Sequence, residues 1–229
     1  MRSRWTDQVG AILWKEALSE LRGRHGLFTA GMFGLLTVVA LVFASFSETL
    51  SSGTVAAMLT VALVFSAVVT VPRTLISEDE QGTFSLLVLL SDPGAAFFGK
   101  MLANCVQMLV GGGVLATVYL AMTGTTVAQP LFFVVALVLF SLSLAVGTSF
   151  CGALVLGSSN RWLLAGVVSM PLLVPVVFLG VVALRNGLGG GFETVGRQSL
   201  VALGGYCLTL LAGGPGLIGR VWGSDKRRE

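Results

Sequence analysis

The sequence predicts an all-α membrane protein with six transmembrane helices, and three observations support this prediction. Hydrophobic residues make up 55% of the chain, charged residues only 11%, and the mean hydropathy is +0.90. Soluble domains contain about 25% charged residues. The charges also cluster, and between the clusters lie uncharged stretches long enough to cross a bilayer core of about 30 Å, namely residues 26–47, 49–72, 101–160, 162–184 and 198–219.

Residues 1–25 precede the first uncharged stretch and predict an amphipathic helix in the membrane interface. Its apolar members recur at helical spacing: Trp5, Val9, Ile12, Leu13, Ala17 and Leu21. The other side carries Arg4, Gln8, Lys15, Ser19 and Arg22. The segment is read as uncleaved, because the following apolar run is too long for a signal peptide. The pattern leaves open whether this helix is only a membrane anchor facing anionic lipid or has a functional role.

Residues 26–229 are predicted to form a single six-helix membrane domain. Residues 101–160 are too long for one span, and the turn-like sequence TGTTVAQP at 123–130 divides them. Nearly all of the chain is used by the spans and their short connections, which leaves no room for a separate soluble domain. The predicted spans are 26–47, 49–72, 101–122, 131–156, 162–184 and 198–219.

The connection between spans two and three, residues 73–100, is predicted to be a coupling loop that another protein binds. It holds an acidic cluster, a glycine hinge and a strongly apolar segment where water is expected, a combination typical of helix-in-groove recognition. The alternative is a helix folded back on the bilayer surface. The candidate coupling residues are Glu78, Asp79, Glu80, Gln81, Gly82, Thr83, Phe84 and Leu87.

The same loop contains a spacing that imitates a phosphate-binding P-loop. Residues 94–100 read GAAFFGK, but Met101 stands where a P-loop has Ser or Thr to hold magnesium. No buried strand is expected before it. We therefore predict that this chain is not an enzyme and that any ATPase is a separate protein.

The basic residues predict that both termini and the loop at 73–100 face the cytoplasm. In this orientation only Arg185 and Arg197 of the fourteen Lys and Arg residues lie outside, as the positive-inside rule requires. The same rule explains the net charge of +3 without nucleic-acid binding. The external segment 185–197 also carries Glu193, and it is either a solvated loop or a contact for an external partner.

The residues within the spans suggest packing rather than cofactor or metal chemistry. The cysteines Cys105, Cys151 and Cys207 are odd in number, lack C-x-x-C spacing and read as apolar packing residues. His25, the one histidine, is read as an interfacial residue rather than a haem ligand. Pro171 and Pro175 lie within span five and predict a helix kink. The spans hold no acidic or basic residue, which argues against coupling to an ion gradient.

Several motifs resemble the CcmB family, the membrane subunits of the haem exporter of cytochrome c maturation. They are KEALSELRGRHGL at 15–27, EDEQGTFSLLVLLSDP at 78–93, GKMLAN at 99–104 and PLLVP at 171–175. The loop motif alone is less specific, because it resembles that of ABC-2 exporter permeases in general. This chain departs from the family pattern at Ser85 and in the position of Pro93.

The resemblance implies an inner-membrane permease that pairs with itself and with a CcmA-like ATP-binding subunit, where ATP and magnesium bind. The loop at residues 78–90 corresponds to the coupling helix of that family. Further implied partners are CcmC-like and CcmD-like membrane proteins and a CcmE-like haem chaperone, which handle haem. The implied function is to couple ATP hydrolysis to haem export or to release of the haem-loaded chaperone.

Two other functions fit the residues. One is an ABC-2 permease that exports a lipid, a polysaccharide or a drug. The other is a membrane scaffold without a transport cycle, which predicts normal cytochrome maturation when the partner ATPase is catalytically dead. The transported species and the faces that contact other subunits are not encoded in any recognisable motif.

Overall fold

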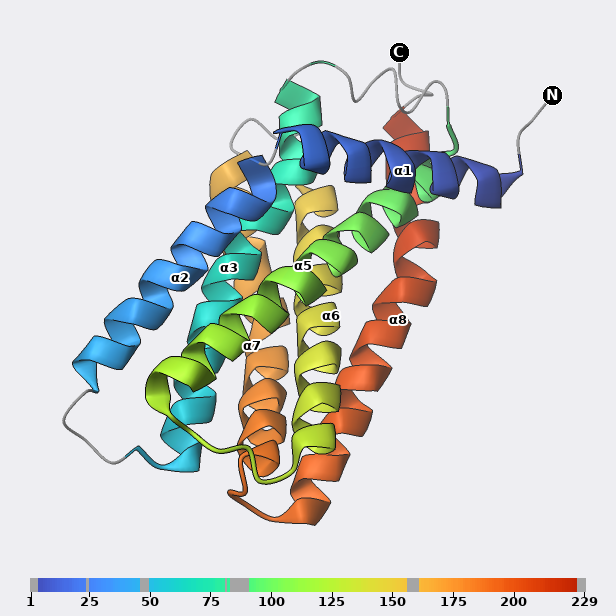
Figure 1. The fold of residues 1–229 in the computed structure, drawn as a ribbon. Coiled ribbons are helices and arrows are strands. Elements are labelled where there is room, and N and C mark those ends of the chain that lie inside the picture. Colours follow the sequence, from blue (N-terminus) through green and yellow to red (C-terminus); the bar gives the residue numbers. More distant parts are fainter. Residues whose placement is uncertain are drawn as a thin grey trace.

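The computed structural model describes residues 4–23, 25–45, 50–80, 82, 91–155 and 161–225. These residues form α1 (Trp5–Gly23), α2 (His25–Ala44), α3 (Ser52–Glu80), α5 (Pro93–Thr123), α6 (Pro130–Leu154), α7 (Arg161–Gly187) and α8 (Glu193–Asp225). The all-α prediction is thereby confirmed for the described part of the chain. Six of the helices run side by side as a bundle, and α1 lies across one end of it (Figure 1).

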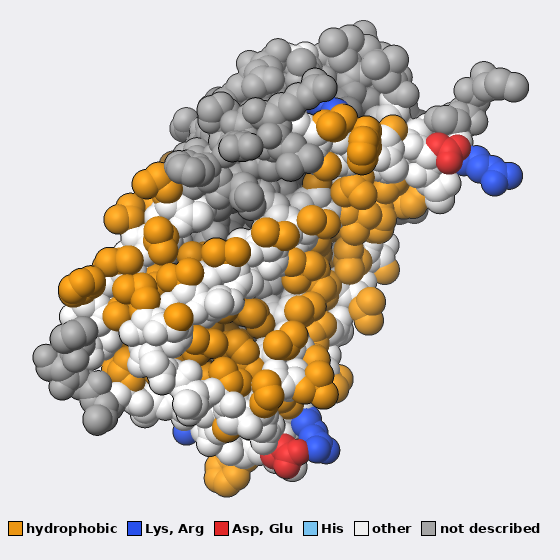
Figure 2. All heavy atoms as spheres, in the orientation of Figure 1, with side chains coloured by type: hydrophobic (Ala, Val, Ile, Leu, Met, Phe, Trp, Pro, Cys, Tyr) orange, Lys and Arg blue, Asp and Glu red, His pale blue; other side chains and the backbone are white. Residues whose placement is uncertain are grey.

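Four of these helices are long and apolar enough to cross a membrane: residues Ser52–Val69 of α3, Pro93–Thr123, Pro130–Leu154 and Val167–Gly187 of α7. Figure 2 shows hydrophobic side chains over the middle of one face, with the coloured acidic and basic side chains confined to its two ends. This distribution matches a hydrocarbon belt between two polar interfaces. The chain is therefore a multi-pass membrane protein.

Local sequence explains where α5 and α6 begin and end. The Asp92 side chain caps α5 by accepting a hydrogen bond of 2.9 Å from the Gly94 amide, and Pro93 occupies the first turn. Gly124 ends α5 in the left-handed conformation at φ 63°, and α6 starts at Pro130. The division predicted within residues 123–130 is therefore confirmed.

The helices extend beyond several predicted boundaries. The predicted loop at 73–100 is shorter than expected, because α3 continues to Glu80 and α5 already starts at Pro93. The predicted external loop at 185–197 is also mostly helical, and only Leu188–Phe192 separates α7 from α8. Uncharged length measures the bilayer core, and a helix that leaves the core continues into water wherever its residues favour helix.

The core of the bundle surrounds α6, which contacts α3, α5, α7 and α8. Fully buried side chains from α6 and the surrounding helices meet there, including Leu59, Leu63, Phe97, Met101, Phe140, Leu144, Leu184 and Leu203. Glycines permit close approach between helices, as two positions on α7 illustrate. A Cβ at Gly180 would lie 2.4 Å from the Phe140 ring, and one at Gly187 would lie 2.8 Å from the Phe133 backbone.

Candidate functional site

The predicted coupling residues fall at the connection between α3 and α5. Glu78, Asp79 and Glu80 form the last residues of α3. Gly82 is exposed and adopts a φ of 69°, a left-handed conformation that suits glycine and a change of chain direction. Gln81, Thr83, Phe84 and Leu87 lie outside the described residues. Helices α3 and α5 both meet this connection at the end of the bundle where α1 lies (Figure 1).

Helix α1 packs directly on the first turns of α5, next to this connection. Val9 and Ile12 of α1 are buried, and a Cβ added to Gly99 of α5 would lie 2.9 Å from Ile12 Cγ2 and 3.2 Å from the Val9 carbonyl oxygen. The rings of Trp5 and Phe98 lie 5.3 Å apart. The apolar side of α1 thus faces α5 as well as any membrane.

Polar contacts reinforce this packing. The Lys100 ammonium group donates a hydrogen bond of 2.9 Å to Glu16 Oε1, and its side chain is only 1% exposed. The Asp92 backbone amide, immediately before α5, donates to Gln8 Oε1 at 2.9 Å. Removing the Glu16 carboxylate would be unfavourable, because the Lys100 charge would stay buried without this acceptor. The contacts of Gln8 and Glu16 therefore fix the position of α1 on α5.

These contacts add a partner to one sequence interpretation and correct another. Gln8 was assigned to the polar side of the amphipathic helix but lies against Asp92. Lys100 was placed in the loop as a cytoplasmic charge, yet it is buried in the second turn of α5. The P-loop-like residues Gly94–Lys100 lie in the first two turns of α5, which agrees with the interpretation that their spacing only imitates a phosphate-binding loop. Sequence could not pair Glu16 with Lys100, because the residues are 84 positions apart.

Helix α5 connects this site to the rest of the bundle. The Asn104 side-chain amide donates to Ser149 Oγ of α6 at 3.0 Å, one turn beyond Lys100. On another side, a Cβ at Gly214 of α8 would lie 3.1 Å from the buried ring of Phe97. A displacement of the first turns of α5 would therefore press on both α6 and α8.

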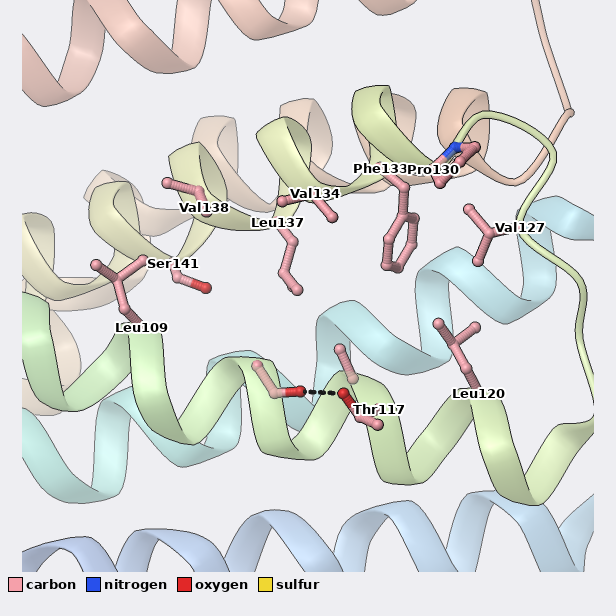
Figure 3. Close-up of a pocket in the computed structure, with 12 residues that line it drawn as sticks. Leu109, Thr117, Leu120, Val127, Pro130, Phe133, Val134, Leu137, Val138 and Ser141 are labelled. Carbon is pink, nitrogen blue, oxygen red and sulfur yellow. Dashed lines mark hydrogen bonds between the residues drawn. The ribbon is translucent and has the colours of Figure 1, made fainter.

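A separate apolar pocket of about 420 Å³ lies between α5 and α6 (Figure 3). Phe133, Leu137 and Ser141 extend from α6 toward α5 in this view. The Thr117 hydroxyl bonds the Gly113 carbonyl of its own helix at 2.8 Å, whereas the buried Ser141 hydroxyl has no partner in the described part of the chain. This pocket has no ionisable lining residue.

The remaining predicted site residues are placed as follows. Pro171 and Pro175 lie inside α7, and both are exposed. The kink expected at these residues stays a prediction. His25 is the first residue of α2. The described residues contain no group of three or more His, Cys, Asp or Glu arranged to hold a metal ion. At the far end, Arg185 is exposed, and Glu193 and Arg197 pair with each other on α8.

Comparison with known proteins identifies a family. The family model described as CcmB protein matches residues 8–217, which is most of the chain. A search of curated proteins finds no match. The matched region begins within α1 and ends within α8, so it contains both sides of the α1–α5 contact.

Proposed function

The chain belongs to the CcmB family, and on that premise we propose that the connection between α3 and α5 is where its ATPase partner grips it. CcmB is the permease of the CcmAB haem exporter in cytochrome c biogenesis, an inner-membrane subunit that is not itself catalytic. ATP hydrolysis takes place in CcmA. We propose in addition which residues couple to CcmA, how the helices cross the membrane and which further partners bind.

We propose six spans, formed by α2, α3, α5, α6, α7 and α8, with both termini and α1 on the cytoplasmic side. The charges at the two ends of the bundle support this arrangement, because most of the basic residues assigned to the cytoplasm flank the end where α1 lies. In this orientation α3 and α5 deliver their connection to the cytoplasm, where an ATP-binding subunit works.

The observation that carries the coupling role is the local geometry of this connection. An acidic helix end, Glu78–Glu80, is followed by Gly82 in a left-handed conformation. The residues after it, with Thr83, Phe84 and Leu87, would supply the apolar side that enters a groove of the ATPase. A second chain of the same kind would complete a dimer bound to two ATPase subunits.

CcmC-like and CcmD-like membrane proteins and a CcmE-like haem chaperone are the further partners we propose. The chain itself would bind no haem, and its contribution would be to convert ATP hydrolysis into movement that exports haem or releases the loaded chaperone. Pro171 and Pro175 would let α7 bend during this cycle.

Co-purification of the CcmA-like subunit tests the coupling role. Gly82→Val is strained at a positive φ, and Phe84→Ala removes the proposed apolar anchor. We expect either change to lose the ATPase from complexes in which the permease accumulates normally. Thr194→Ala, an exposed position at the opposite end of the bundle, is the control. Unaltered ATPase association and stimulation in both variants would contradict the proposal.

A further inference from the structure

We propose that α1 is a working part of the coupling apparatus, in which Glu16 acts as a positioning residue that holds the start of α5 through Lys100. This inference rests on the proposed function, because it assumes that the ATPase acts at the connection between α3 and α5. It resolves the role of the N-terminal helix, which the sequence left open between an anchor and a functional element.

Helix α1 contacts α5 through a partly buried ion pair. A helix that only anchors a protein to lipid needs an apolar face toward the bilayer and charges toward water. Here a carboxylate of α1 is half-buried and holds an ammonium group that is only 1% exposed, at 2.9 Å. Burying such a charge is unfavourable unless its partners are well placed, so the pair fixes both the register and the orientation of α1 on α5.

The contacts of α1 are spread along the first two turns of α5. Gln8 bonds the backbone of Asp92, the residue that caps the helix, and Glu16 bonds Lys100 two turns later. Ile12 lies between them in sequence and packs against Gly99. Contacts at successive turns of α1 thus hold the first two turns of α5 as one body with it.

The start of α5, held together with α1, also contacts two other helices of the bundle. Asn104 joins α5 to α6 through Ser149, and Phe97 packs beside Gly214 of α8. A push at the connection before Asp92 reaches the bundle through α5, and α1 prevents the first turns of α5 from bending away under the load. Without that support, the ATPase would continue to hydrolyse ATP, but less of the resulting movement would be transmitted to the bundle.

The test measures how much cytochrome c matures per ATP hydrolysed by the assembled complex. Glu16→Gln and Lys100→Gln each weaken the pair, and the swap E16K with K100E restores opposite charges. We expect each single change to lower this ratio about fivefold or more, the size typical of coupling between sites. ATPase association should be normal, and the swap should regain most of the ratio. Asp7→Asn, which removes an exposed acidic charge from the same helix, is the matched control.

An unchanged ratio in single variants that assemble normally would overturn the inference, and so would a swap that assembles but regains nothing. If the single variants do not accumulate, Gln8→Ala decides the matter. It changes the more exposed end of the same contact, and a wild-type ratio there would overturn the inference. Failure of the proposed function is distinguishable, because in that case Gly82→Val and Phe84→Ala would both retain the ATPase.

Discussion

The two ends of the bundle are built by different kinds of contact. At the α1 end, residues 84 positions apart are joined by a buried ion pair and a bond to a helix cap. At the opposite end, the side-chain contacts are local: Asn186 donates to the Phe192 carbonyl at 2.9 Å, and Glu193 pairs with Arg197 one turn away. The longer-range polar contact there is between backbone groups, because the Gln129 amide donates to the Gly187 carbonyl of α7 at 3.0 Å. Long-range contacts transmit a displacement between helices, whereas local ones shape only the turn that contains them.

Gly99→Val should have the largest effect, because it breaks the α1 end directly. Even a Cβ at this position meets Ile12 and the Val9 carbonyl oxygen within about 3 Å, so α1 must shift. Overpacking of this kind costs about 1–3 kcal/mol. We expect a lower midpoint of thermal unfolding in detergent. Gly113→Ala in the same helix, with open space around the added methyl group, is the control, and equal midpoints for the two variants would contradict the packing.

Asp92→Ala should have a smaller effect at the same end. It removes the side-chain acceptor that caps α5 and should reduce the free energy of unfolding by about 1 kcal/mol. Asp92→Asn keeps an oxygen acceptor and should retain most of the stability. The measurement is thermal unfolding of the purified chain, and equal losses in both variants would argue against capping by this side chain.

Ser141→Ala, in the pocket between the two ends, should change stability in the opposite direction. Its hydroxyl is buried without a partner in the described part of the chain, so removing it relieves a desolvation cost of about 1 kcal/mol. We expect a higher unfolding midpoint. Ser143→Ala provides the contrast, because that hydroxyl bonds the Leu139 carbonyl at 2.8 Å. A loss of stability in Ser141→Ala equal to that of Ser143→Ala would contradict this reading.

Glu193→Gln at the opposite end should change the free energy of unfolding least. Both members of this pair are largely exposed, at 58% and 72%, and exposed pairs contribute less than about 1 kcal/mol. The midpoints of thermal unfolding of Glu193→Gln and Glu16→Gln compare the loss of an exposed carboxylate with the loss of a partly buried one. A larger loss from Glu193→Gln would reverse the comparison between the two ends.

The sequence predicted the helices well and their long-range contacts poorly. Uncharged length locates the bundle helices, and Gly124 with Pro130 locates a turn, because both signals are local. The acidic residues after α3 also pointed to the connection that the proposed function uses. The same reasoning treated Lys100 as solvent-facing, because residue type alone predicts exposure. Only the fold brings Glu16 beside Lys100 and makes burial of that charge tolerable.

Accessibility labelling of single cysteines tests the central claim most directly, that the end of the bundle where α1 lies faces the cytoplasmic ATPase. Thr6→Cys and Thr194→Cys place exposed thiols at opposite ends, while the three native cysteines are buried. With a membrane-impermeant maleimide in cells whose outer membrane alone is permeable, we expect labelling at position 194. Position 6 should react only after the inner membrane is opened. Labelling of position 6 from the periplasm would contradict the account, because no cytoplasmic ATPase could then reach the connection between α3 and α5.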